Sequence, residues 1–269
     1  MKMEELARRR RSVRTFDGTP LTPEELDRIR AAADRTEDPY GIPIRWHILD
    51  AKEYGLSSAV ITGEKTYLTG VLHRVPHAEE AFGFCFERLL LNCVEEGFST
   101  VWLAGTLDRR AFEKAVGLQK GEVMPCVSPV GRPAQKMSVR ETVMRKGTGA
   151  DARLPYEKLF FAGDFDTPLS PQEDPVLTKL LEPVRWAPSA VNRQPWRVVV
   201  CDDRFHFYVK HNRGYVSADG WDLQKVDLGI AMCHLALGLE EAGGYSLELA
   251  DPGLRVPKDT EYAATVRRI

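Results

Sequence analysis

The feature that most constrains the fold is a set of landmarks that occurs twice, in the same order. The first landmark is the segment from Phe16 to Glu25, which contains a proline at a helix start. A similar segment runs from Phe165 to Glu173. The strand-like run Pro43 to Leu49 has its counterpart at Pro195 to Val200. Because the landmarks recur at a spacing of about 150 residues, we predict a duplication of one α+β unit rather than two unrelated domains.

Each copy also contains one long apolar segment. Phe82 to Gly97 and Val226 to Gly243 have helical spacing of apolar residues and carry a Glu-Glu pair with a glycine close behind. Strand-like runs follow them, at Thr100 to Leu103 and at Tyr245 to Leu249. A helix that is apolar on nearly every side must be buried, so we predict that the two helices pack against each other at the centre.

Capping residues predict where two shorter helices begin and end. Thr22 to Glu25 supplies an N-cap, a proline at the first helical position and a capping-box glutamate, for a helix that runs to about Asp34. Ser170 to Glu173 predicts the same start in the second copy. Pro188 should end that second helix, and Pro183 should kink it.

The two copies keep different special residues. The first has Arg10 to Arg14, a candidate anion site, where the second has the uncharged run Leu159 to Gly163. The second has the turn Pro188 to Asn192 where the first has Thr36 to Tyr40. By residue type alone, the arginine run is typical of a solvated tail and the turn of an ordinary helix-to-strand corner. A duplicated dimer that kept only one of two composite sites would divide its residues in this way.

Composition predicts a soluble cytoplasmic protein. The net charge of −2 gives no overall attraction to nucleic acid or membranes. The five cysteines contain no Cys-x-x-Cys pair, which favours a reducing compartment. No apolar run is long enough to cross a bilayer, and the basic amino terminus lacks the apolar segment of a secretory signal.

Familiar catalytic motifs are missing from the sequence. It contains no GxGxxG loop after a strand, no phosphate-binding P-loop, no HExxH and no GxSxG. His73 and His77 have helical metal-ligand spacing, but Pro76 lies between them, so we expect no metal site. His234 is expected to be a core histidine, and Trp102 and Trp196 to pack in the core or at a corner.

Three segments together resemble the nitroreductase family of FMN enzymes. They are Arg-Arg-Ser-x-Arg-x-Phe at 10–16, Ala-Pro-Ser-x-x-Asn-x-Gln-Pro-Trp at 187–196, and Gly97 to Gly105, which is similar to the family's Gly-Leu-Gly-x-x-Trp-x-x-Gly segment. More narrowly, the chain resembles single-chain members in which two half-sized copies imitate the usual dimer. The resemblance implies an α+β nitroreductase-like fold with two tandem half-units, 1–155 and 156–269. Each would combine an antiparallel or mixed sheet with helices in a pseudo-dimer around central buried helices, with one FMN site per chain.

The resemblance also assigns roles to single residues. Arg10 and Ser12 would bind the phosphate and ribityl end of FMN with Arg11 and Arg14 beside them, since guanidinium groups bind phosphate through forked donors. Arg14 would lie nearest the flavin pyrimidine edge. Gly105, with Thr106, would turn a backbone N–H toward flavin N5. The residues expected along the other side are Pro188, Ser189, Ala190 and Asn192.

Two positions depart from the family pattern. Arg153 is similar to a second phosphate ligand, but Asp151 stands where a basic residue is usual. Arg145, Lys146 or Lys136 could replace that residue, and the sequence does not choose among them. Ala104 stands where some members have glutamate, so no carboxylate is expected near flavin N5.

The implied activity is that of an NAD(P)H-dependent FMN oxidoreductase. Hydride would pass from NAD(P)H through flavin N5 to a nitroaromatic, a quinone or a similar flat acceptor, with no protein nucleophile. A flavin-binding carrier or sensor and a degenerate non-catalytic scaffold are the alternatives, and Asp151 favours the scaffold. The expected partner is a small-molecule acceptor, without nucleic acid or membrane. An intramolecular pseudo-dimer is compatible with a monomer.

Overall fold

The computed structural model describes residues 1–218 and 220–269, and packing divides the chain into two compact units. The N-terminal unit consists of Arg9–Ala78 and Cys85–Ala150. The C-terminal unit consists of Asp151–Ile269 with Met1–Arg8 and Glu79–Phe84. These units are defined by packing, whereas the halves 1–155 and 156–269 are defined by sequence repetition, so the latter division stays a prediction.

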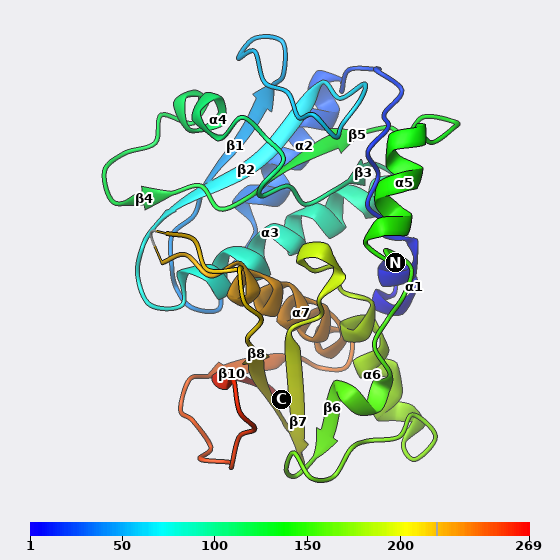
Figure 1. Ribbon diagram of the computed structural model, residues 1–269, viewed down its shortest axis with the longest axis vertical. Helices are drawn as coiled ribbons and strands as arrows, with labels where there is room; N and C mark the ends of the chain where they lie inside the picture. The colour runs from blue at the N-terminus through cyan, green and yellow to red at the C-terminus, as the bar shows by residue number, and fades with distance from the viewer. Residues whose placement is uncertain (219) are drawn as a thin grey trace. The chain divides into compact units, whose positions relative to one another are not determined.

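The N-terminal unit is built on an antiparallel sheet with the strand order β1-β2-β5-β3, to which β4 is added on β2 (Figure 1). The ring of Tyr67 meets that of Phe112 edge to face in the core of this unit, with their centroids 4.9 Å apart. The elements are α2 (Pro23–Asp34), β1 (Arg45–Asp50), β2 (Thr66–His73), most of α3 (Ala78–Glu95), β3 (Ser99–Thr100), α4 (Arg109–Ala115), β4 (Glu122–Val123), β5 (Val127–Gly131) and α5 (Val139–Gly147).

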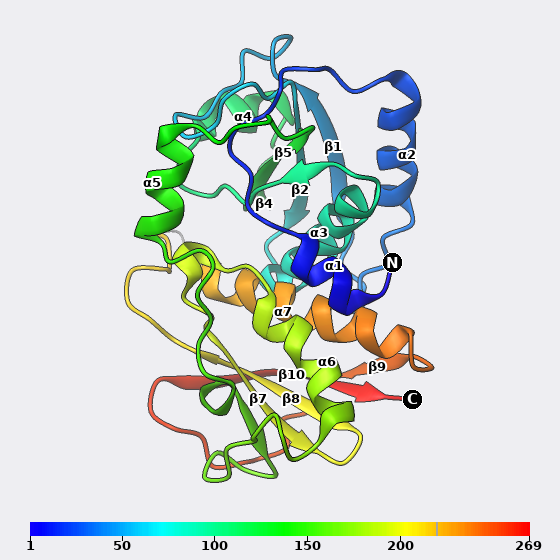
Figure 2. The same cartoon turned by 90° about the vertical axis from the view of Figure 1, so that its right-hand side faces the viewer.

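The C-terminal unit has the strand order β6-β7-β8-β10-β9, in which only the β6–β7 pair is parallel among the described strands. Helix α6 packs on α7, as Figure 2 shows. The elements are α1 (Met3–Arg9), the 3-10 turn η1 (Tyr156–Lys158), β6 (Phe160–Ala162), α6 (Pro175–Trp186), the 3-10 turn η2 (Ala190–Asn192), β7 (Trp196–Cys201), β8 (Arg204–Lys210), α7 (Leu223–Glu240), β9 (Tyr245–Glu248) and β10 (Thr260–Arg268).

The two sheets repeat one topology. Strands β1, β2, β5 and β3 take the same order as β7, β8, β10 and β9. The helices that precede each first strand, α2 and α6, both have 12 residues, and α3 and α7 both have 18. The predicted tandem α+β organisation is therefore confirmed.

The two long helices meet at a pair of glycines. A Cβ on Gly83 of α3 would collide with the carbonyl oxygen of Val226, and a Cβ on Gly229 of α7 would collide with that of Glu80. Gly83 follows Glu80 by three residues and Gly229 follows Val226 by three residues, so the two contacts are equivalent. Since side chains at these positions would separate the backbones, glycine lets α7 and the Glu79–Phe84 part of α3 come together, as predicted from their apolar surfaces.

One predicted helix start is confirmed and the other is wrong. The Thr22 hydroxyl accepts from the Glu25 N–H at 3.3 Å, and the Glu25 carboxylate closes the capping box. In the second copy α6 starts later, because the Asp174 carboxylate accepts from the Val176 and Leu177 N–H groups, each at 2.9 Å. Asp174 followed by a proline is itself a strong helix start, and it lies four residues after Ser170.

The end of α6 agrees with the prediction, whereas one strand is shorter than predicted. Helix α6 ends before Pro188 and includes Pro183 within its bounds. The expected strand from Thr100 to Leu103 is ladder-paired only at Ser99–Thr100. The Val101 N–H donates instead to the Ser128 hydroxyl at 3.2 Å, so the chain leaves the regular ladder there.

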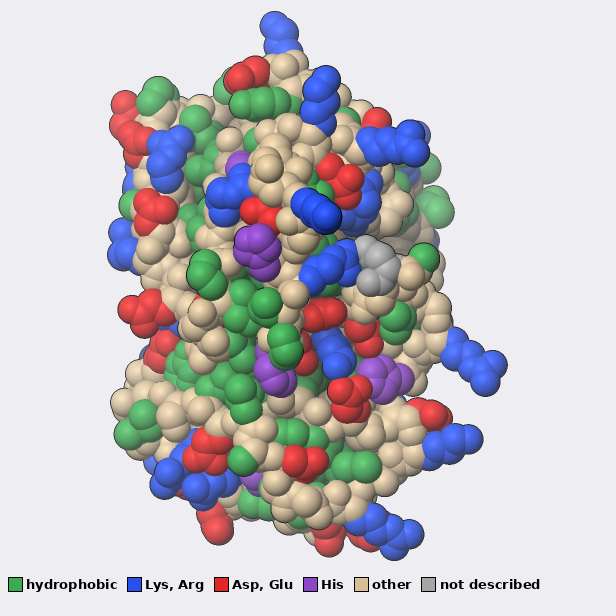
Figure 3. All heavy atoms as spheres, turned by 90° about the vertical axis from the view of Figure 1, so that its left-hand side faces the viewer, with side chains coloured by type: hydrophobic (Ala, Val, Ile, Leu, Met, Phe, Trp, Pro, Cys, Tyr) green, Lys and Arg blue, Asp and Glu red, His purple; other side chains and the backbone are tan. Residues whose placement is uncertain are grey.

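No helix among residues 1–218 and 220–269 is long and apolar enough to span a bilayer. Acidic and basic side chains are interspersed over the face drawn in Figure 3.

Candidate functional site

Two motifs that are far apart in the sequence lie side by side in the N-terminal unit. Ser12 forms an isolated parallel bridge with Thr100, and the Val13 N–H donates to the Thr100 carbonyl at 3.1 Å. This pairing aligns the arginine motif with the segment that leads to Gly105. Backbone pairing therefore joins two of the three segments on which the flavin expectation depends.

Arg10 and Arg14 have buried donor groups that lack an acceptor among the described residues. Nε of Arg10, and Nε and Nη1 of Arg14, have no hydrogen-bond partner within the described part of the chain. Only 9% of Arg10 is exposed, whereas Arg11 lies at the surface. Buried donors are almost always satisfied in folded proteins, and guanidinium groups with open donors match a phosphate or carboxylate.

Burial lowers the pKa of both Arg10 and Arg14. The positive charge of Arg145 lowers it further, while Glu87 for Arg10 and Glu141 for Arg14 raise it. Three guanidinium groups thus act on one region, with Glu87 near Arg10 and Glu141 near Arg14. A bound anion would relieve the repulsion among these cations.

Helix α5 is attached to the arginine motif at its first turn. The Glu141 carboxylate accepts from the Arg14 N–H at 3.1 Å and from the Thr15 hydroxyl at 2.8 Å. The Ser138 N–H donates to the Thr15 hydroxyl at 3.1 Å. Arg145 follows Glu141 by four residues on the same helix face, and its Nη1 donates to the Ser12 carbonyl at 3.3 Å. The first-turn contacts therefore explain why Arg145 lies at the motif.

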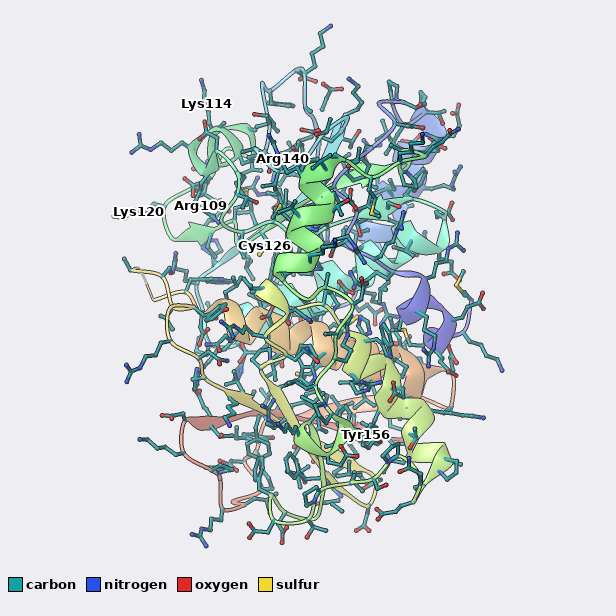
Figure 4. The ribbon with its side chains drawn as sticks, turned by 45° about the vertical axis from the view of Figure 1, so that its right-hand side comes forward. Arg109, Lys114, Lys120, Cys126, Arg140 and Tyr156 are labelled. Atoms are coloured by element: carbon teal, nitrogen blue, oxygen red, sulfur yellow. The ribbon has the colours of Figure 1, made fainter. Side chains whose placement is uncertain are left out.

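The Gly105 segment is fixed on both sides of the glycine. Arg109, at the start of α4 in Figure 4, donates to the Ala104 carbonyl at 3.0 Å. The Ser58 hydroxyl donates to the Thr106 carbonyl at 2.6 Å. A Cβ on Gly105 would meet no atom of residues 1–218 and 220–269, so packing among them gives no reason for glycine here. Gly105 and Thr106 are both exposed.

Trp102 and Glu87 support the same region. The indole N–H of Trp102 donates to the Glu87 carboxylate at 2.7 Å, and Glu87 is fully buried on α3. This half-buried tryptophan and the fully buried Trp196 agree with the packing roles predicted for them. His234 is likewise buried, with Nδ1 2.8 Å from the Pro183 carbonyl oxygen, so the expected core role is confirmed.

In the C-terminal unit, the turn after α6 has an unusual backbone. Val191, Asn192 and Gln194 have φ values of +49°, +55° and +49°. This left-handed region is uncommon for any residue other than glycine and is rarest for a β-branched residue such as valine. Such geometry persists only where surrounding contacts hold it, and it concentrates at functional sites.

The polar side chains of the turn bond to nearby backbone groups. The Ser189 hydroxyl accepts from the Gln194 N–H at 2.9 Å. The Asn192 amide donates to the Ala152 carbonyl at 3.0 Å, and the Gln194 amide donates to the Asn192 side-chain oxygen at 3.2 Å. Pro188 and Ala190 are half-buried at the same turn. These bonds fix the turn.

Two further residues define the surroundings of the turn. Both carboxylate oxygens of Asp227, on α7, lie 3.0 Å from the Ala190 nitrogen and accept its N–H. Burial raises the pKa of Asp227 well above its usual range. The Arg153 guanidinium lies 4.8 Å from the centre of the Trp186 ring and donates to the Trp186 carbonyl at 3.2 Å. Asp151 is exposed.

Comparison with known proteins assigns the chain to a family. The family model described as "Putative TM nitroreductase" matches residues 2–239. The chain belongs to this nitroreductase family. No curated protein matches the sequence.

A solved structure from the comparison shares the fold over the whole chain. A crystal structure from Thermotoga maritima, described as a "putative nitroreductase", superimposes with a TM-score of 0.66 at 18% identity, covering 100% of this chain and 94% of that one. An FMN-dependent nitroreductase from Clostridium difficile gives a TM-score of 0.42 at 14% identity and covers 52% of this chain and 94% of that one. At 18% identity, the likeness to the Thermotoga maritima structure concerns the fold alone.

Sequence reasoning missed three residues that shape the two candidate segments of this nitroreductase-family protein, the arginine motif and the turn after α6. Asp227 is a lone carboxylate within the apolar run Val226 to Leu239, and this pattern could have identified it from the sequence. Glu141 lies three residues after Ser138, which is the spacing of a capping box. Its carboxylate accepts from Arg14 and Thr15 and does not close that box. Gln194, whose Oε1 accepts from the Leu154 N–H at 2.9 Å, gave no signal beyond its place in the motif.

Proposed function

We propose that this nitroreductase-family protein is an FMN-dependent oxidoreductase that uses NAD(P)H to reduce a flat electron acceptor such as a nitroaromatic or a quinone. Family membership supports the oxidoreductase class. The observation that carries the FMN proposal is the set of buried guanidinium donors on Arg10 and Arg14 that find no acceptor among the described residues. A phosphate dianion supplies the acceptors and the negative charge that these groups lack.

The residues of the N-terminal unit would bind the polar end of the cofactor. Arg10, Arg14 and Arg145 are proposed phosphate ligands, with Arg11 at the rim and Ser12 at the ribityl chain. Arg145 is chosen over Lys136 and Lys146 because it bonds to the Ser12 carbonyl, whereas both lysines are exposed. We also propose that the positive charge of Arg14 stabilises negative charge on the reduced flavin pyrimidine.

The open space at Gly105 supports a backbone role. Because no atom of the described residues would touch a Cβ there, a ligand that approaches the chain closely would account for the glycine. We propose that the Gly105 or Thr106 N–H donates to flavin N5. The fixed carbonyls of Ala104 and Thr106 would hold that N–H in place.

The turn of the C-terminal unit is proposed to serve the same FMN. Pro188, Ser189, Ala190 and Asn192 would contact the flavin, and Arg153 would assist at the phosphate. The left-handed backbone and the bracing of the turn support a preformed binding element. The division of the special residues between the two copies supports one composite site rather than two.

When bound, FMN supplies the hydride-accepting and hydride-donating ring, so no protein nucleophile is needed. One site per chain agrees with a monomer, which we propose together with a cytoplasmic location. All five cysteines lie within the described residues and are free thiols, which supports a reducing compartment.

The absorbance spectrum of the purified protein tests cofactor binding, and anaerobic mixing with NADPH and then NADH tests the activity. We expect a flavin spectrum that bleaches with at least one nucleotide. Bound flavin that neither nucleotide bleaches would identify a carrier or sensor. Colourless protein that FMN does not stabilise against heat would identify a scaffold. Arg10→Ala and Asn192→Ala should each weaken FMN retention, and unchanged retention in both would contradict the composite site.

A further inference from the structure

The turn at Pro188–Asn192 needs an external support. Val191 and Asn192 in the turn, and Gln194 just after it, adopt left-handed backbone geometry although none of them is glycine. Val191 also exposes 59% of its surface, so packing of its own side chain does little to hold it there. The Ser189 hydroxyl bonds within the turn, to the Gln194 N–H, and the Asn192 amide bonds to the Ala152 carbonyl of a loop, so neither side chain attaches the turn to a helix.

Asp227 provides that attachment. It lies on α7 with 3% of its surface exposed, and both carboxylate oxygens are 3.0 Å from the Ala190 nitrogen. The Ala190 N–H is the only hydrogen-bond donor to this carboxylate within residues 1–218 and 220–269. A buried carboxylate is costly without a cationic partner, and a leucine would fill such a position on an apolar helix at lower cost.

The first copy offers an internal comparison. Gly83 and Gly229 are counterparts at the helix crossing, so Asp227, two residues before Gly229, corresponds to Ala81. In the first copy, where the turn motif is replaced by Thr36 to Tyr40, the loop is closed by its own Asp38, which accepts from the Tyr40 and Ile42 N–H groups. At this helix position, the copy that kept the turn motif has a carboxylate and the other copy has an alanine.

We propose that Asp227 is a positioning residue that anchors the Ala190 N–H and thereby holds the Ser189–Asn192 turn in the geometry that receives the flavin. The flavin part rests on the proposed function, while the anchoring part concerns the protein alone. The anchor acts through the backbone N–H of Ala190, so it fixes the position of the turn. It does not use the side chains of Ser189 and Asn192, which keep their own hydrogen bonds.

The experiment compares Asp227→Leu and Asp227→Asn with the wild type in two measurements. The first is the rate at which trypsin cleaves the apoprotein after the exposed Arg193, which reports release of the turn without any cofactor. The second is the rate of FMN release from the loaded protein. Leu235→Ala is the matched control, since it removes buried apolar atoms from α7 but no polar partner of the turn. All rates are compared at equal distance below each melting temperature.

We expect Asp227→Leu to speed cleavage after Arg193 and to release FMN about tenfold faster or more, because the Ala190 N–H loses its buried acceptor. Asp227→Asn keeps an oxygen acceptor and should stay close to the wild type in both rates. If Asp227→Leu does not fold, Asp227→Ala takes its place with the same expectation.

Cleavage and FMN release in Asp227→Leu that match Leu235→Ala would overturn the proposal, as would an Asp227→Asn variant as impaired as Asp227→Leu. If the wild type binds no FMN, the proposed function fails, but cleavage after Arg193 still decides whether Asp227 anchors the turn. Faster cleavage with unchanged FMN release would contradict the flavin part alone.

Discussion

Arg145 on α5 donates from Nη1 to the backbone carbonyl of Ser12 at 3.3 Å, joining positions 133 residues apart. The bond places a third guanidinium beside Arg10 and Arg14, whose pKa values its charge helps to lower. Asp151 leaves this chain without the basic residue that related sequences are expected to carry there. We propose that Arg145, on α5, fills the same chemical role.

Replacing Arg145 with methionine should weaken FMN binding through the phosphate. We expect the Kd for FMN to rise about tenfold or more, because one charge-assisted contact is lost. The Kd for riboflavin, which has no phosphate, should stay unchanged in the same titration. Lys146→Met is the control, since that neighbouring side chain is exposed and should have little effect. An equal loss for FMN and riboflavin would contradict a phosphate contact.

The helix crossing predicts opposite effects of alanine at two glycines of α7. Gly229→Ala should lower the free energy of unfolding by about 3 kcal/mol or more, since its Cβ would collide with the Glu80 carbonyl. Gly238→Ala should raise it by up to about 1 kcal/mol, because alanine is the better helix former and its Cβ would only touch Leu180 at 3.5 Å. Urea denaturation followed by circular dichroism measures both, and similar values for the two variants would refute the crossing.

Strain at Val191 can be relieved by substitution. Asparagine tolerates the left-handed region better than a β-branched residue, so Val191→Asn should raise the free energy of unfolding by about 1 kcal/mol. Val176→Asn serves as the control, because Val176 is similarly exposed but lies in the first turn of α6. A loss of stability in Val191→Asn would show that the valine side chain has a packing role.

A surface ion network should make stability depend on acidity. Burial alone would raise the pKa of Glu261, but its bonds to Lys225 and His211, each 2.8 Å, outweigh that and lower it. A folded pKa below the unfolded value means that Glu261 stabilises the fold at neutral pH, and this contribution disappears as the pH falls through the folded pKa. Glu261→Gln should therefore be less stable than the wild type near neutrality, with the difference shrinking in acid.

Urea denaturation at a series of pH values, from about 7 down to about 3, measures this difference. Glu240→Gln is a suitable control, since Glu240 is an exposed carboxylate at the end of α7 outside the network. A stability difference for Glu261→Gln that stays constant over the series would rule out the linkage.

The comparison of Thr22 with Ser170 shows how far local sequence predicts helix starts. Both begin a Pro-containing segment with a glutamate three residues on, yet only Thr22 caps a helix. Asp174 offers a competing cap four residues later, and nothing local ranks the two. The choice depends on which register places Leu181 and Val184 in the core, where both are fully buried.

The sequence by itself determined the repeat, the two buried helices and the turn, because each is encoded in short-range patterns of apolar, proline and capping residues. Only the tertiary structure decided that Arg145 rather than Lys146 lies at Ser12, that Asp227 holds Ala190, and that Gly83 and Gly229 meet. These contacts join residues that are far apart in the chain, and their formation depends on packing between whole elements. Local periodicity carries no information about which partners that packing brings together.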